Sequence, residues 1–212
     1  MIPERPVSIA LADGTALEGA LALPEGVQAG VLICHPHPRY GGDMDSPVVL
    51  SAADACARRG LATLRFNLRG VGGSRGTWDE GRGEQDDVRA ALAYLRSRLG
   101  SPARIALAGY SFGAVMAAAV ASGGESTAGL ALIAPPLASS GWQRFSTLAT
   151  AGPLLIVAGG EDTSCPRDAL AALARALPAA TITLIDGADH FFHSGQDALA
   201  AALGVWAGKL AA

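Results

Sequence analysis

The segment Gly109–Gly113 reads Gly-Tyr-Ser-Phe-Gly, so a serine stands between two glycines at the spacing G-x-S-x-G. It follows the apolar run Arg104–Ala108, which predicts a strand, and a helix is expected to begin near Phe112. A tight strand-to-helix turn exposes the serine hydroxyl and leaves no room for side chains at the flanking positions. The turn also aims the helix N-terminus at the reacting group, where the backbone N–H of Phe112 can bind an oxyanion. We therefore expect Ser111 to be a nucleophile, the alternative being a glycine-rich turn with a capping serine.

A serine hydroxyl needs a base that removes its proton, and the base needs an acid that orients it. With this kind of turn, the order along the chain is serine, acid and then histidine. Asp162 follows the apolar run Leu154–Ala158, and His190 follows the run Ile182–Ile185. Parallel sheets collect their functional groups at the carboxyl ends of the strands. We therefore expect Asp162 to be the acid and His190 the base.

Other residues compete for these two roles. Glu161 precedes Asp162 in the same turn and is the rival acid. His193 also follows the acid, but it lies near the start of the last expected helix, where it is expected to face solvent. His35 and His37 come before the serine, and with prolines between them and no nearby carboxylate–histidine cluster they make a poor zinc site. We expect no metal, and we expect His35 to hold its loop through hydrogen bonds.

The loop over residues 34–43 reads CHPHPRYGGD and follows the third expected strand. In this arrangement such a loop supplies a second N–H to the oxyanion. The prolines of the loop have no N–H to donate. The residues alone therefore leave three candidates for the second donor, which are His37, Arg39 and Tyr40. Tyr40 is also expected to contact the substrate.

Short apolar runs separated by helical stretches predict the framework that positions these residues. An antiparallel hairpin turning at Asp13-Gly14 is expected first, from Val7–Leu11 and Ala16–Leu23. The following runs are nearly continuous, as in strands covered on both faces: Gly30–Cys34, Ala62–Phe66, Ile105–Ala108, Gly129–Ile133, Leu154–Ala158 and Ile182–Ile185. Helices are expected between and after them: Val48–Arg59, Glu84–Leu99, Gly113–Ala121, Arg167–Ala176 and Ser194–Leu210. The pattern predicts one α/β domain over residues 1–212, with about eight mostly parallel strands and helices on both faces of the sheet.

The segment 134–153 is where a cap domain would be inserted, and it has only 20 residues. It holds one short expected helix, Trp142–Ala149, with Trp142, Phe145 and Leu148 on one face. That face either walls the substrate pocket or packs on the core, and we expect Trp142 to contact the substrate. Without a cap the site is an open cleft that buries few methylene groups, each contributing about 0.8 kcal/mol.

Composition excludes several classes of protein. In 212 residues, 50% hydrophobic and 17% charged, the chain is too apolar for disorder. A net charge of −3 and only 5% aromatic residues argue against nucleic-acid binding, which needs positive charge and aromatic side chains for base stacking. No apolar stretch is long enough to span a membrane, no signal segment is evident, and three scattered cysteines favour a reduced compartment, so we expect a cytoplasmic protein. The glycine-rich segment 69–76 matches neither a P-loop nor G-x-G-x-x-G, and no cofactor is expected.

The sequence resembles the α/β-hydrolases, in particular the small hydrolases without a cap that are related to dienelactone hydrolase-type enzymes. Five segments carry the resemblance: Cys34–Gly42 (CHPHPRYGG), Phe66–Gly76 (FNLRGVGGSRG), Gly109–Gly113 (GYSFG), Gly159–Pro166 (GGEDTSCP) and Gly187–Phe191 (GADHF). The resemblance implies a catalytic triad of Ser111, Asp162 and His190. It also implies that the N–H of His37 joins that of Phe112 in the oxyanion hole.

The sequence departs from the family pattern at two positions. Asn67 stands where relatives often have an aspartate, which affects only the bracing of a loop. The nucleophile is a serine and not the cysteine of dienelactone hydrolases proper, which argues against a dienelactone. We expect a serine carboxylesterase that cleaves small esters through an acyl-enzyme. The alternatives are a thioesterase or another acyl hydrolase with the same triad, and a non-catalytic binding protein on this fold; the sequence does not predict the oligomeric state.

Overall fold

The computed structural model describes residues 3–148 and 150–211, and the side chain of Trp142 lies outside the described part. Its strands are β1 (Arg5–Ala10), β2 (Ala16–Ala22), β3 (Ala29–Cys34), β4 (Ala62–Phe66), β5 (Arg104–Tyr110), β6 (Leu130–Ile133), β7 (Leu154–Gly159) and β8 (Thr181–Ile185). Its α-helices are α1 (Pro47–Ala57), α2 (Gly83–Leu99), α3 (Phe112–Ser122), α4 (Leu137–Ser140), α5 (Arg167–Ala176) and α6 (Gln196–Ala211). Two 3-10 turns complete the described elements: η1 (Pro38–Tyr40) and η2 (Trp142–Phe145).

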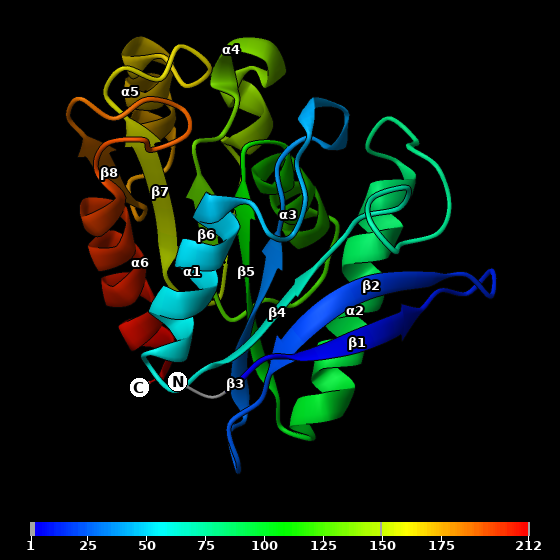
Figure 1. Ribbon diagram of the computed structural model, residues 1–212. Helices are drawn as coiled ribbons and strands as arrows, with labels where there is room; N and C mark the ends of the chain where they lie inside the picture. The colour runs from blue at the N-terminus through cyan, green and yellow to red at the C-terminus, as the bar shows by residue number, and fades with distance from the viewer. Residues whose placement is uncertain (1–2, 149, 212) are drawn as a thin grey trace.

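The eight strands form one sheet in the order β1-β2-β4-β3-β5-β6-β7-β8. β1 pairs with β2, and β2 with β4, in antiparallel fashion, and every other neighbouring pair is parallel. This confirms the expected α/β-hydrolase fold with an antiparallel N-terminal hairpin. The parallel strands all point toward the end of the molecule that carries η1 and α4, so their carboxyl ends meet there (Figure 1).

Helices cover both faces of the sheet because the central strands are apolar on both sides. In β3, Leu32 faces one buried cluster, whereas Val31 and Ile33 face the other. The first cluster is completed by α2, α3 and α5, and the second by α1 and α6. Figure 1 shows α1 and α6 on the near face of the sheet, with α2 and α3 behind it. Strands buried on both faces are the reason why their sequences read as continuous apolar runs.

The segment between β6 and β7 differs from its prediction. In place of one helix over Trp142–Ala149 it forms the short helix α4 and then η2, separated by Gly141 at φ +72°. Phe145 and Leu148 are buried and pack on the core, so the apolar face is used for packing. The described part of this segment forms two helical turns and no cap domain over the sheet, as expected.

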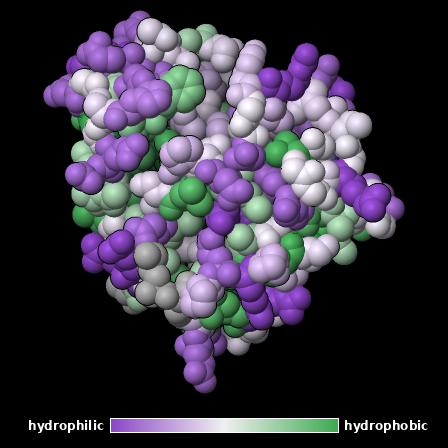
Figure 2. Space-filling model, viewed as in Figure 1, coloured by the Kyte–Doolittle hydropathy of each residue, from purple (hydrophilic) through white to green (hydrophobic). Residues whose placement is uncertain are grey.

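The face of the molecule seen in Figure 2 is largely polar. Figure 2 shows hydrophilic residues spread over the face in view, with the hydrophobic ones in small separate groups. Among the described residues no helix combines the length and the apolar character needed to cross a bilayer.

Candidate active site

Ser111 occupies a strained turn between β5 and α3. Its backbone has φ +53° and ψ −114°, a conformation that a residue with a side chain rarely adopts. A Cβ on Gly109 would lie far inside contact distance of the Gly113 carbonyl, and one on Gly113 would strike the carbonyl of Cys34. The two flanking glycines are therefore needed because backbone passes directly over them, as the sequence pattern predicts.

His190 lies between Ser111 and Asp162 and is hydrogen-bonded to both. Its Nε2 is 2.9 Å from Ser111 Oγ, and its Nδ1 is 2.8 Å from Asp162 Oδ2. The Asp162 side chain is fully buried, whereas 19% of the His190 side chain is exposed. The partners imply that Nδ1 carries a proton toward the carboxylate, which leaves Nε2 free to accept the proton of the serine hydroxyl.

Neighbouring loops hold the acid and the base in these positions. Asp162 Oδ1 accepts the backbone N–H groups of Ser164, at 2.8 Å, and Cys165, at 3.2 Å, which fixes the carboxylate. The hydroxyl of Tyr110, at the end of β5, donates to the carbonyl of His190 over 3.0 Å. Strand β5 therefore contributes to the position of the base as well as to that of the serine.

The rival candidates lie outside this hydrogen-bonded set. Glu161 is exposed, and its N–H donates to the carbonyl of Ala188. The side chain of His193 is 77% exposed and pairs with Asp189 at 2.7 Å, as a solvent-facing histidine is expected to do. That hydrogen bond lowers the pKa of the Asp189 carboxyl.

One of the three candidate oxyanion donors in the loop after β3 has a backbone N–H without an acceptor in the described part of the chain. Of the three candidate donors, the N–H of Arg39 binds His37 Nδ1 at 3.2 Å and that of Tyr40 binds the His37 carbonyl at 3.1 Å. The N–H of His37 donates to no acceptor in the described part of the chain, and the same holds for the N–H of Phe112. Both residues line the cleft beside Ser111. The two N–H groups are thus available to an oxyanion.

His35 holds the base of this loop, as expected. It is fully buried, its Nε2 accepts the N–H of Leu68 at 3.0 Å, and its Nδ1 is 2.6 Å from the carbonyl of Pro36. This pattern requires a neutral ring with the proton on Nδ1. Burial lowers the pKa of His35 to about 4.

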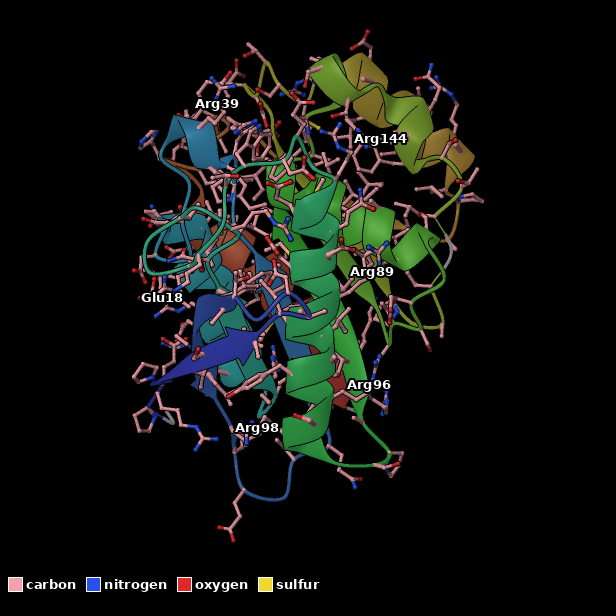
Figure 3. The ribbon with its side chains drawn as sticks, turned by 90° about the vertical axis from the view of Figure 1, so that its right-hand side faces the viewer. Glu18, Arg39, Arg89, Arg96, Arg98 and Arg144 are labelled. Atoms are coloured by element: carbon pink, nitrogen blue, oxygen red, sulfur yellow. The ribbon has the colours of Figure 1, made fainter. Side chains whose placement is uncertain are left out.

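The serine opens into a cleft of about 700 Å³. Tyr40 lines the cleft and is 87% exposed, and Phe191 beside the base is 59% exposed. Arg144 also lines it, and Figure 3 places Arg39 and Arg144 at this end of the molecule, with Arg96 and Arg98 toward the other end. The prediction that Trp142 contacts the substrate concerns a side chain that lies outside the described part of the structure.

Sequence reasoning missed Trp78, whose ring packs against two residues of the site. Its centroid is 4.7 Å from that of His37 and 5.0 Å from that of Phe112. The only signal in the sequence is a lone tryptophan in a glycine-rich loop. Within the described ranges, no group of three or more histidine, cysteine, aspartate or glutamate residues could hold a metal ion.

Comparison with known proteins places this geometry among hydrolases. A family model described as X-Pro dipeptidyl-peptidase (S15 family) matches residues 13–190. The chain is 34% identical over 184 residues to an uncharacterized protein of Rickettsia prowazekii, covering 83% of this chain and 77% of that protein.

Solved structures of other proteins are similar to this chain in overall fold. An α/β serine hydrolase homologue from Coxiella burnetii has a TM-score of 0.83 and 35% identity, covering 97% of this chain and 98% of that one. An α/β serine hydrolase without a lid from Xanthomonas campestris has a TM-score of 0.84 and 32% identity, covering 96% and 93% of the two chains. An esterase from Pyrococcus furiosus, at 17% identity and a TM-score of 0.80 over 100% and 92% of the chains, shares the fold.

Proposed function

The chain belongs to the X-Pro dipeptidyl-peptidase (S15) family within the α/β-hydrolase superfamily, as a small serine hydrolase homologue without a cap, and on that premise we propose that it hydrolyses small carboxylic esters. The observation that carries the proposal is the continuous hydrogen-bonded set Ser111–His190–Asp162 at the floor of an open cleft. A strained serine, an imidazole and a buried carboxylate in this order are what acyl transfer requires.

The mechanism follows from these positions. Ser111 Oγ attacks the ester carbonyl while His190 Nε2 takes its proton, and Asp162 stabilises the imidazolium through Nδ1–H. The N–H groups of Phe112 and His37 bind the oxyanion of the tetrahedral intermediate. His190 then protonates the leaving alcohol, which leaves an acyl group on Ser111. Water activated by the same histidine hydrolyses the acyl-enzyme and restores the free serine.

The open cleft favours short acyl groups. Phe145 and Leu148, two apolar residues of the segment between β6 and β7, are buried in the core and are not among the residues that line the cleft. A longer acyl chain then gains little burial, at about 0.8 kcal/mol per methylene that is buried. We expect a preference for acyl groups of about two to six carbons, since further methylene groups extend into water.

The family match makes cleavage after an X-Pro dipeptide the second candidate function. Thioester hydrolysis on the same triad is the third. The three differ in the leaving group: an alcohol, an amine or a thiol.

We also place the protein in a reducing compartment such as the cytoplasm, because Cys34, Cys56 and Cys165 are all free and buried.

A substrate panel separates these functions. Values of kcat/KM are compared for p-nitrophenyl esters from acetate to palmitate, the matching thioesters and an X-Pro p-nitroanilide. Ser111→Ala is the test variant and Ser139→Ala, a second serine that lines the cleft, is the matched control. The proposal expects short esters to be the best substrates, with turnover lost in Ser111→Ala and kept in Ser139→Ala. Preference for the anilide or for long acyl chains contradicts it.

A further inference from the structure

Glu84 is a fully buried acid that the proposed reaction does not use. It lies in the first turn of α2, and its Oε1 accepts the N–H of Asp79 at 2.8 Å while its Oε2 accepts the N–H of Gly81 at 2.8 Å. A carboxylate is buried at high cost unless hydrogen bonds replace its water. Here both oxygens are occupied by one loop, so Glu84 fixes residues 78–81 to the start of α2.

Two further contacts confine the same loop. The side chain of Gln85 donates to the carbonyl of Gly81 at 2.8 Å, so both backbone groups of Gly81 are held by α2. Gly81 has φ +84°, and a Cβ there would lie 3.1 Å from Met116 Cε and 3.7 Å from Phe112 Cε2. The loop is thus pressed against the first turn of α3, the helix that begins beside the nucleophile.

Trp78 joins this loop to both proposed oxyanion donors. The rings of Trp78, His37 and Phe112 form a closed triangle, with centroids 4.7, 5.0 and 5.0 Å apart. His37 belongs to the loop after β3 and Phe112 to the N-terminus of α3, and more than 70 residues of chain lie between them. The distance between the two residues is therefore set by packing and not by a short connecting segment. Trp78 itself is not among the residues that line the cleft. Glu80 and Gly81 of the same loop do line the cleft, but the Trp78 ring packs on His37 and Phe112. We therefore expect the ring to act on the reaction through these two neighbours.

We infer that Glu84 is a positioning residue for the oxyanion hole, acting through Trp78 on the spacing between the N–H groups of His37 and Phe112. The inference rests on the proposed function. Oxyanion donors act only when they lie about 2.7–3.1 Å from the developing charge. A shift of about 1 Å in such a group lowers the rate by about 100-fold. Binding of the uncharged ground state depends much less on this spacing.

Asp87 provides a matched control. It lies one turn further along α2, its side chain is also fully buried, and it binds the Arg69 guanidinium at 2.7 Å and the Arg69 N–H at 2.9 Å. It makes no hydrogen bond to residues 78–81 within the described chain. Asp87→Asn therefore removes a buried carboxylate from the same helix and leaves the loop bonds of Glu84 in place.

The test compares Glu84→Gln, Trp78→Leu and Asp87→Asn in the intact protein. For each variant, kcat and KM are measured with a short p-nitrophenyl ester, Ki with a short alkyl boronic acid that forms a tetrahedral adduct on serine, and Tm by calorimetry. In Glu84→Gln the amide nitrogen cannot accept a backbone N–H. We expect kcat to fall about 10- to 100-fold with KM within about twofold, and Ki to rise in parallel with the loss of kcat/KM. Trp78→Leu should show the same pattern, and the double variant should lose little more than either single one.

Asp87→Asn should lower Tm and leave kcat and Ki within about twofold. The inference is overturned if Glu84→Gln lowers Tm with kcat unchanged, if only KM rises, or if kcat falls while Ki for the boronic acid does not rise. Should Glu84→Gln fail to fold, Trp78→Leu decides alone, and an unchanged kcat there overturns the inference. A wild-type protein without ester hydrolysis would instead contradict the proposed function.

Discussion

The buried histidine below the oxyanion loop should make the fold sensitive to mild acid. Burial lowers the pKa of His35 to about 4 in the folded protein, against about 6.5 in an unfolded chain. Between these values the unfolded chain binds more protons, so the free energy of unfolding falls as the pH falls. The stabilisation that neutral His35 contributes is complete above about pH 6.5 and is lost progressively as the pH falls to about 4. At that pH the free energy of unfolding has fallen by about 3 kcal/mol.

Between pH 7 and pH 5 this linkage predicts a loss of about 2 kcal/mol from His35 alone. In His35→Gln the side-chain oxygen can accept the Leu68 N–H and residue 35 no longer titrates, so most of this loss should disappear. Urea unfolding at pH 7, 6 and 5 and constant ionic strength measures it. His193→Gln is the control, because that ring is 77% exposed, and it should not reduce the loss. The reasoning is refuted if the wild type and His35→Gln lose equal free energy between pH 7 and pH 5.

Four other substitutions test the remaining parts of the site and fold. Gly113→Ala should lower Tm sharply and remove activity, because its Cβ would strike the carbonyls of Cys34 and His35. Gly208→Ala in α6, where the nearest atom is 4.0 Å from the new Cβ, should raise the free energy of unfolding by about 0.5–1 kcal/mol in urea unfolding. Asp162→Asn should keep KM and lower kcat by about 10⁴-fold, because the amide favours the wrong tautomer of His190. His190→Ala should abolish turnover, and wild-type kcat/KM should fall as the pH is lowered, since only the neutral imidazole accepts the serine proton; an undiminished rate in acid would contradict its role as base.

The sequence predicts the parallel sheet because a strand that is buried on both faces has apolar residues at successive positions, as β3 does. It also predicts that Ser111, Asp162 and His190 lie at the carboxyl ends of strands, and the structure brings their side chains together. Strand order and the carboxyl-end rule are enough to infer this proximity, because they do not depend on side-chain detail.

Other features depend on contacts that no local pattern records. The helix expected over Trp142–Ala149 is wrong, because the described part of that range forms only the 3-10 turn η2, with Phe145 packed in the core. The choice among three N–H donors depends on which of them the η1 turn uses internally. The packing of Trp78 on His37 and Phe112 joins three segments far apart in the chain. The buried Glu84 that binds the neighbouring Asp79 and Gly81 reads in the sequence as an ordinary acid at a helix N-terminus.

The central claim is that Ser111 is a nucleophile activated by His190, and covalent labelling measures it most directly. The protein is treated with a fluorophosphonate, digested, and mapped by mass spectrometry, with His190→Ala and Ser111→Ala treated alongside. The account predicts one adduct, on the peptide that contains Ser111, formed far more slowly in His190→Ala and absent in Ser111→Ala. An adduct on another serine, or ester hydrolysis that continues while Ser111 stays unlabelled, would contradict it.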